Sequence, residues 1–472
     1  METSAAAITM GILTPGVKGN SEERVVSPPS SSVPVSLKKD IEELVNGIPF
    51  VDTHEHLLPE QERLETAGSS TVTPALDFGL LMSHYTDSDL QVAGMSGEDH
   101  KRLISKELSP AEKWKLVSPY YERCRYTGYQ QCVREAVRVL YGEDDIRADN
   151  CERISRLIRE GVRPGFYRRI LREVSNIEYA QVNCLKSPVF RETETASDFL
   201  CFDLWTVGIA SNVNLGTLNG VAGTEVTSLK QAHETIRLAF ERYGRKAIAV
   251  KDQSAYSRRL NYTDVTDDEA APIFERFVKG DRTLTLEERH ALQNNLFREC
   301  LRLASEYNLP VKLHTGYAAG HGHMNLGNVR DNFTDIARLA MDFPQTKFVL
   351  MHIGYPYQQE LIALCKHFPQ IYADMCWAWI VDPASSTRFL VEFLMAAPAS
   401  KLFVFGGDFI PVELVAGHAR VARKGIARAL GQLVEDDWLR ASDVPALAER
   451  IMRGNAHEIY DLNRVLAAYS GS

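Results

Sequence analysis

The sequence predicts an α/β protein built as a (β/α)8 TIM barrel, and three observations lead to this fold class. Short apolar runs recur along the chain, helical patterns separate many of them, and a polar, chemically capable residue follows one run after another. Strands alternating with helices form a parallel sheet, which is either doubly wound or closed into a barrel. Functional residues at the carboxyl ends of several strands are typical of the barrel. A doubly wound sheet instead collects them at one switch point, and no glycine-rich phosphate fingerprint follows the first run.

The expected strands are short apolar runs bounded by polar or turn residues, the pattern of strands buried on both faces. They are Ile48–Val51, Glu178–Asn183, Ala247–Val250, Pro310–Leu313, Phe348–Met351, Ile371–Met375 and Leu402–Phe405. Two helices between them have clear ends. One begins with a capping box at Thr285 and stops before Pro310. The other runs from about Gln358 to His367.

The chain has 472 residues, whereas a (β/α)8 barrel needs about 250. Residues 83–172 read as helices between the first strand and the next clear one, so we expect a helical insertion on the catalytic face there. Residues 1–36 contain a Ser- and Pro-rich stretch with little apolar periodicity, which predicts a disordered leader. Residues 37–472 are then one barrel unit that includes the insertion.

Composition excludes several classes of partner. The chain is 44% hydrophobic and 24% charged, as ordinary globular proteins are. Its net charge of -9 argues against nucleic acid or an anionic membrane as the main partner. The sequence contains no run of about 18 consecutive apolar residues, so we expect no membrane span. The eight cysteines are scattered without a Cys-x-x-Cys pair, which predicts a reduced, cytoplasmic protein. The composition leaves open whether the protein forms a homo-oligomer.

The first strand carries His54 and His56 at its end. Residues two apart in a strand point to the same side, so both imidazoles can face one point. Two neutral imidazoles that converge are typical metal ligands. The pair by itself is modest evidence, because short His-x-His patterns also arise by chance.

Later strands supply the missing ligand types. His314 and His352 each follow an apolar run, and Asp408 follows a Gly-Gly pair after another. Imidazoles with one carboxylate suit zinc, manganese or a similar divalent ion. An open coordination position would hold a water and lower its pKa, and Asp408 could take its proton. Each residue alone could be a packing or turn residue, but together they favour a metal site. The remaining histidines, His84 among them, are expected at the surface or in packing.

These motifs resemble the amidohydrolase superfamily of metal-dependent barrel enzymes over roughly residues 48–462. Within it, the chain is similar to the amidohydrolase-related branch, which contains uronate isomerases and the amidohydrolase-like domains fused to glutamine-synthetase-type proteins. The local matches are Val51-Asp52-Thr53-His54-Glu55-His56, Val250-Lys251 with Tyr256 and Arg258, His314-Thr315-Gly316, Met351-His352-Ile353-Gly354-Tyr355-Pro356, Gly406-Gly407-Asp408 and Gly454-Asn455-Ala456.

The resemblance implies a ligand set. It implies that His54, His56 and Asp408 bind metal, together with His314, and that His352 binds a second ion or polarises the substrate. Lys251 stands where binuclear members carry a carboxylated, bridging lysine. The alternative is a lysine that binds an anionic substrate group or pairs with an aspartate. We therefore expect one or two divalent ions per chain, Zn²⁺ or Mn²⁺, with one ion as the simpler expectation.

Substrate-binding residues should lie on loops beyond the strand ends. The candidates are Tyr256, Arg258, His321 and Trp377. Arginine, histidine and aromatic side chains together suit a small polar molecule that carries a carboxylate. Each of them could instead belong to a solvated loop or pack against the insertion.

We expect a metal-dependent hydrolase that attacks an amide, ester or lactone carbonyl, with Asp408, His352 and Lys251 as catalytic residues. Three alternatives stay open. A uronate-isomerase-like enzyme would move protons between adjacent carbons of a sugar acid. A decarboxylase would break a carbon–carbon bond. A non-catalytic barrel would serve as a binding module, although such a module has no physical need for a full ligand set.

Overall fold

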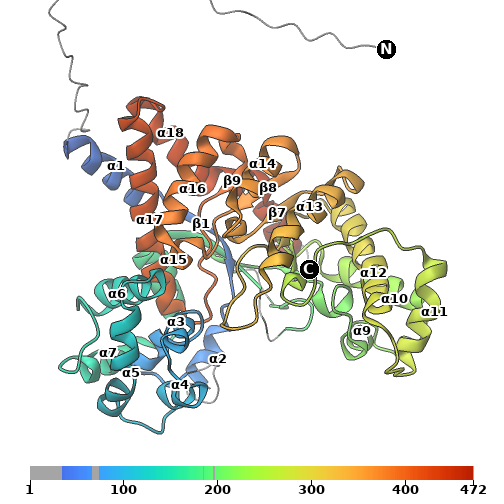
Figure 1. The fold of residues 1–472 in the computed structure, drawn as a ribbon, viewed down its shortest axis with the longest axis horizontal. Coiled ribbons are helices and arrows are strands. Elements are labelled where there is room, and N and C mark those ends of the chain that lie inside the picture. The colour runs from blue at the N-terminus through green and yellow to red at the C-terminus, as the bar shows by residue number, and fades with distance from the viewer. Residues whose placement is uncertain (1–34, 66–73, 184, 186, 195–196, 471–472) are drawn as a thin grey trace, which may run out of the picture.

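The computed structural model describes residues 35–65, 74–183, 185, 187–194 and 197–470. A disordered leader was predicted over residues 1–36. Residues 1–34 of it lie outside the described part of the chain. The described chain opens with helix α1 (Val35–Gly47). Figure 1 shows a central set of strands surrounded by helices, with one helical lobe formed by the early part of the chain.

The described strand segments pair in parallel in the order of the sequence. They are β1 (Phe50–Glu55), β2 (Ile177–Val182), β3 (Leu200–Phe202), β4 (Leu204–Trp205), β5 (Val250–Asp252), β6 (Val311–Leu313), β7 (Phe348–Leu350), β8 (Ile371–Asp374) and β9 (Leu402–Phe403). Only Asp203 separates β3 from β4, and its N–H donates to Val182 O at 3.0 Å. The two segments therefore act as one strand, and the chain supplies the eight strands of a (β/α)8 barrel.

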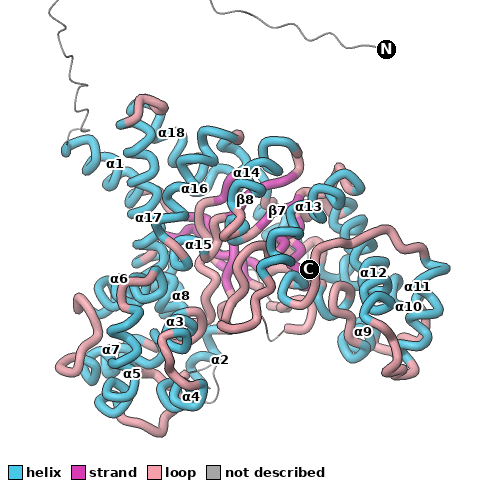
Figure 2. Tube along the Cα trace, viewed as in Figure 1, coloured by secondary structure: helices cyan, strands magenta, loops and turns pink. Residues whose placement is uncertain are grey.

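Backbone hydrogen bonds close the barrel between the first and last strands. Thr53 N donates to Phe405 O at 3.0 Å, and Asp408 N donates to His54 O at 2.8 Å. Figure 2 shows the strands in the middle of the molecule with helices around them. The predicted (β/α)8 barrel is confirmed, as is a helical insertion after its first strand.

Each expected apolar run overlaps a strand, but the strand formed by β3 and β4 was not expected. Its apolar run is broken by Asp203, whose charge would be unfavourable in a buried strand without a partner. The partner is Lys312 on β6, whose Nζ lies 2.8 Å from Asp203 Oδ1. Local sequence does not reveal such a pair, because the two residues are far apart in the chain.

The insertion consists of helices between β1 and β2, and its predicted bounds of 83–172 stay a prediction. Its helices, with the preceding α2, are α2 (Glu60–Glu65), α3 (Thr86–Val92), α4 (Gly97–Ile104), α5 (Pro110–Cys124), α6 (Gly128–Tyr141), α7 (Cys151–Gly161) and α8 (Phe166–Arg168). Helix α6 packs closely on α17 (Val412–Glu435), where a Cβ at Gly417 would lie 2.1 Å from Cys132 O. This close approach holds the insertion against the barrel.

The remaining helices cover the barrel or extend from it, and none of the described helices is long and apolar enough to span a membrane. Both helices with predicted ends are confirmed, and the capping box of Thr285 with Glu288 forms at the start of α12. The remaining helices are α9 (Leu215–Ala222), α10 (Leu229–Tyr243), α11 (Asp267–Val278), α12 (Leu286–Glu306), α13 (Leu326–Asp342), α14 (Gln358–His367), α15 (Ala378–Val381), α16 (Pro383–Ala396), α18 (Val444–Glu449), α19 (Asn455–Ile459) and α20 (Leu462–Ser470).

Asp87 in the first turn of α3 makes the stability of the insertion depend on pH. Burial raises the pKa of its carboxyl to about 7, against about 3.9 in an unfolded chain. The contribution of this group to stability is therefore fully present below pH of about 4 and is lost as pH rises to about 7. We expect Asp87→Asn to gain stability relative to the wild type between pH 5 and pH 8. The gain is of the order of 2–4 kcal/mol.

Urea unfolding at several pH values measures this gain. The amide retains an oxygen that can accept the hydrogen bond from Gln91 Nε2, which is 2.8 Å long in the wild type. Asp144→Asn is a suitable control, because the Asp144 side chain is 89% exposed and should leave the pH dependence unchanged. Parallel stability curves for Asp87→Asn and the wild type would contradict the expectation.

Candidate metal centre

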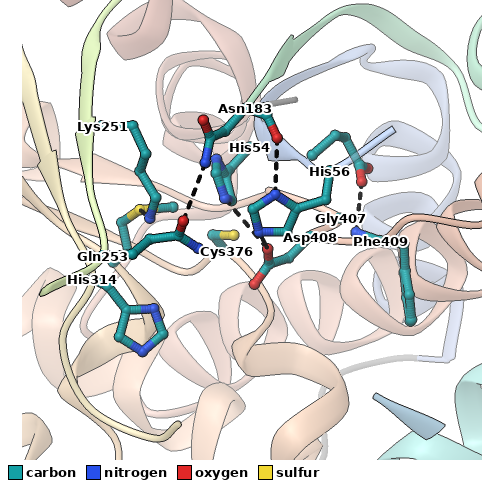
Figure 3. A network of polar contacts seen from close by, with 12 residues as sticks. His54, His56, Asn183, Lys251, Gln253, His314, Cys376, Gly407, Asp408 and Phe409 are labelled. Atoms are coloured by element: carbon teal, nitrogen blue, oxygen red, sulfur yellow. Dashed lines mark hydrogen bonds and ion pairs between the residues drawn. The ribbon is translucent and has the colours of Figure 1, made fainter. Parts of the chain in front are cut away.

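His54, His56 and Asp408 meet at the carboxyl ends of β1 and β9 (Figure 3). His54 Nε2 lies 3.4 Å and His56 Nε2 lies 3.2 Å from the same oxygen, Asp408 Oδ1. All three side chains are buried. The alternation of the strand places both histidines on one side, as the sequence predicts.

The hydrogen bonding of these groups is incomplete without a cation. Within the described part of the chain, both ring nitrogens of His54 and Asp408 Oδ1 have no hydrogen-bond partner, which is costly for buried polar atoms. His56 Nδ1 lies 3.0 Å from Asn183 O. Because a carbonyl only accepts, Nδ1 carries a proton, and Nε2 is the ring atom directed at Asp408. A divalent ion between His54 Nε2, His56 Nε2 and Asp408 Oδ1 would give these three atoms a common partner, so the residues fit a metal.

The charge states suit the same conclusion. Burial and the charge of Lys251 hold the pKa of His54 well below its usual range, so its ring is neutral. Burial acts to raise the pKa of Asp408, but His56, His352 and Lys251 together hold it well below its usual value. The centre therefore offers a neutral imidazole at His54 and an ionised carboxylate at Asp408, which are the forms that bind metal.

His314 and His352 form a second pair beside the first. His352 Nδ1 lies 3.0 Å from Cys376 O, and His314 Nε2 lies 2.9 Å from Tyr317 O. Both outer nitrogens therefore donate, and the two inner nitrogens face each other at 2.9 Å. Burial lowers the pKa of His352 to about 4 and that of His314 well below its usual value. Two neutral rings would turn lone pairs toward each other, an arrangement that also suits a cation.

The backbone is strained where these residues leave the strands. His352, Trp377 and Asp408 all have left-handed backbone conformations, with φ of 66°, 64° and 60°. Such conformations are uncommon for residues other than glycine. They cluster at active sites, where the surrounding structure holds them in place. Three of them at neighbouring strand ends therefore mark this face of the barrel as a functional site.

Lys251 is fully buried on β5, and its Nζ contacts Met351 Sδ at 2.8 Å rather than a carboxylate. Burial lowers its pKa. A neutral amine is the form that carboxylation would require, so a bridging role stays a prediction.

The structure brings two of the four candidate substrate residues to the centre. The Tyr256 ring lies 4.4 Å from that of His314, and the Trp377 ring lies 5.3 Å from that of His352. Arg258 instead donates to Gln293 and Asn294 on α12, at 2.9 and 2.6 Å. These contacts turn its guanidinium away from the centre and do not support the predicted role.

His321, the fourth candidate, lies in an exposed loop with its ring 6.1 Å from that of His323. No short contact ties it to the metal-binding residues among those that the structure describes. Its predicted role in substrate binding stays a prediction.

The site also contains two residues that the sequence did not assign to it. The His84 ring packs beside the centre, 6.4 Å from that of His56, and its expected surface or packing role stays a prediction. Its neighbour Tyr85 is buried and packs on Trp377 with ring centroids 4.5 Å apart. Burial and the carboxylate of Asp408 raise the pKa of the Tyr85 hydroxyl well above its usual value. One feature of the sequence could have placed His84 and Tyr85 at the site. Both residues lie at the start of the insertion that was expected on the catalytic face.

The fold and this site define the class of the protein, an α/β-barrel enzyme with a candidate metal centre at its strand ends. A family model described as Amidohydrolase matches residues 219–462, which is just over half of the chain. The chain therefore belongs to the amidohydrolase family, and the resemblance found in the sequence is confirmed.

Three known proteins extend this result. The uronate isomerase of Cutibacterium acnes is 22% identical over 484 residues, covering 94% of this chain and 98% of that protein. Protein fluG of Emericella nidulans is 26% identical over 183 residues, and the match spans only 21% of that longer protein and 37% of this chain. The glucuronate isomerase structure from Caulobacter crescentus shares the fold, with a TM-score of 0.72, 19% identity, and coverage of 94% of this chain and 97% of that one.

Proposed function

We propose that this protein is a metal-dependent isomerase of a sugar acid, a small molecule with a carboxylate and several hydroxyl groups. One observation carries the proposal. The match to the uronate isomerase of Cutibacterium acnes extends over nearly the whole of both proteins, so the barrel and its insertion both have counterparts there. The hydrolase preferred from the sequence becomes the second candidate, because this full-length similarity favours the isomerase alternative.

The residues of the site suit proton movement between adjacent carbons. His54, His56 and Asp408 would hold a divalent ion, which polarises the oxygens of a bound hydroxy-carbonyl group. The Tyr85 hydroxyl faces Asp408 and is protonated at neutral pH, so it can donate a proton to a substrate oxygen and take it back. The rings of Tyr85 and Trp377 pack against each other beside the metal-binding residues, with centroids 4.5 Å apart.

A direct assay tests the proposal. The metal-loaded protein is incubated with glucuronate and other uronates, and ketose formation is followed by NMR. A panel of amides, esters and lactones is run in parallel. We expect ketose product that disappears after chelation and returns with added metal. Hydrolysis of the panel without any ketose product would instead support the second candidate.

Replacement of Tyr85 by phenylalanine tests the proton role of its hydroxyl. We expect kcat to fall about a hundredfold or more, the range of general acid–base catalysis, while KM and metal content stay near wild type. The ring packing against Trp377 is retained, so the fold should not change.

Tyr129→Phe is the matched control for this variant. Tyr129 belongs to the same aromatic cluster, with its ring 6.4 Å from that of Tyr85, and it has no assigned role in the chemistry. A wild-type kcat for Tyr85→Phe would remove Tyr85 from the reaction.

A metal-dependent hydrolase is the second candidate, and a specific observation favours it. A sugar-acid carboxylate would need a cationic partner, yet Arg258 is bound by α12 and Arg259 is paired with Asp335 at 3.0 Å. Neither arginine is available to a substrate in this arrangement. An amide, ester or lactone without a carboxylate makes no such demand.

A further inference from the structure

Cys376 places a buried thiol at the candidate metal centre. It lies two residues after the end of β8, its side chain is fully buried, and its Sγ lies within 4.8 Å of ligand atoms of both His352 and Asp408. Figure 3 shows its sulfur beside the Asp408 carboxylate. Packed thiols elsewhere behave differently, because Cys132 and Cys124 donate to the carbonyl oxygens of Leu414 and Tyr120.

The backbone of Cys376 holds the sulfur in this position. Its N–H donates to Asp374 Oδ1 at 2.8 Å, and its carbonyl accepts from His352 Nδ1 at 3.0 Å. In the segment that follows the neighbouring strand β9, a Cβ at Gly406 would lie 2.9 Å from the sulfur. The glycine two residues before Asp408 therefore makes the space that the thiol occupies.

The carboxylate of Asp408 stands between two groups of donor atoms. Its Oδ1 faces His54 and His56, is buried and has no hydrogen-bond partner among the residues that the structure describes. Its Oδ2 lies 3.9 Å from His352 Nδ1 on the side of the thiol. This buried oxygen is an observation independent of the cysteine, and it points to a cation that both groups can reach.

We propose that Cys376 binds the metal of this centre as a thiolate, alongside Asp408 and the neighbouring histidines. The proposal rests on the metal dependence in the proposed function. On binding, a sulfur–metal bond forms and the thiol proton leaves to solvent, with no electron transferred. One carboxylate and one thiolate neutralise a divalent charge, which favours the complex in a buried site. A sulfur ligand also makes the site softer, so it should prefer zinc or cobalt over manganese and magnesium.

Cobalt spectroscopy tests the proposal on the full-length protein. The protein is freed of metal with a chelator and titrated with Co²⁺ alone. We expect visible d–d bands from bound cobalt together with a near-ultraviolet sulfur-to-cobalt charge-transfer band. In Cys376→Ser the charge-transfer band should vanish while the d–d bands remain, and zinc affinity should fall by about tenfold or more relative to manganese.

Cys365→Ser is the matched control. Cys365 is equally buried, but it lies on α14, away from the strand ends, so the charge-transfer band should remain. A charge-transfer band that survives in Cys376→Ser overturns the proposal, as do d–d bands without charge transfer in the wild type. The latter result leaves the proposed function intact. Absence of all cobalt bands overturns the thiolate ligand and the metal dependence together.

A second measurement needs no variant and decides the matter even if Cys376→Ser does not fold. X-ray absorption of the zinc-loaded wild-type protein should contain a sulfur scatterer at about 2.3 Å, the usual zinc–sulfur distance. A zinc shell with only nitrogen and oxygen neighbours would overturn the proposal.

Discussion

Replacement of Asp408 by asparagine is expected to lower kcat by at least about a hundredfold, the lower end of the range for a lost acid–base group, and to reduce bound metal. The substitution keeps the size of the side chain but removes the negative charge that His54 and His56 face at 3.4 and 3.2 Å. A neutral amide is a weak partner for a divalent ion, and it cannot accept a proton as a carboxylate does. Steady-state kinetics with any verified substrate and metal analysis of the purified variant measure the two effects.

Asp437→Asn is a closely matched control for this variant. Asp437 has the same residue type and a left-handed backbone conformation with φ of 58°, close to the 60° of Asp408, but it is exposed at the end of α17. It should keep its activity and metal content. Undiminished activity of Asp408→Asn, with an intact circular dichroism spectrum, would refute the assigned role of Asp408.

Replacement of Lys312 by methionine is expected to destabilise the protein by about 3–5 kcal/mol, the cost of leaving one partner of a buried ion pair alone. Lys312 Nζ lies 2.8 and 3.0 Å from the two oxygens of Asp203 and donates to Thr53 O at 2.8 Å. Both charged side chains are fully buried. Loss of the ammonium would leave the Asp203 charge without compensation inside the barrel. Chemical denaturation measures the change in the free energy of unfolding.

A double variant separates this explanation from simple loss of packing. Lys312→Met combined with Asp203→Leu removes both charges, so it should recover part of the stability that the single variant loses. Lys39→Met controls for lysine loss in general, because Lys39 is 73% exposed in an ion pair with Glu43. Its change should stay within about 0.5 kcal/mol. A Lys312→Met variant close to wild-type stability would contradict the account.

The barrel and its closure illustrate how far local sequence patterns reach. Runs such as Phe348–Met351 predict strands because hydrophobic periodicity is a local property, and the polar residue after each run marks the carboxyl end of a strand. The third barrel strand escaped prediction, because its buried Asp203 is tolerable only beside Lys312, more than a hundred residues later. Long-range compensation of this kind leaves no signal within a short window of sequence.

The site shows the same division. The spacing of His54 and His56 predicts that both face one point, since the strand period alone places them on the same side. Side-chain direction on loops follows no such period. Arg258 could therefore be named as a substrate ligand from its position in the chain, although its guanidinium binds α12. Tyr85 lies near Asp408 because Tyr85 and Tyr129 pack on Trp377 at the strand ends.

The sequence by itself determined the fold class, the order of the strands and the residues most suited to bind metal. Periodicity and capping are set by neighbours in the chain, and a parallel barrel brings strand ends together by rule. Only the tertiary structure decided that Asp408 stands between the histidine pair and the Cys376 thiol, and that Lys312 neutralises Asp203 in the barrel interior. Those relations depend on distances between segments that are far apart in the chain. Only the packing of the folded protein sets such distances.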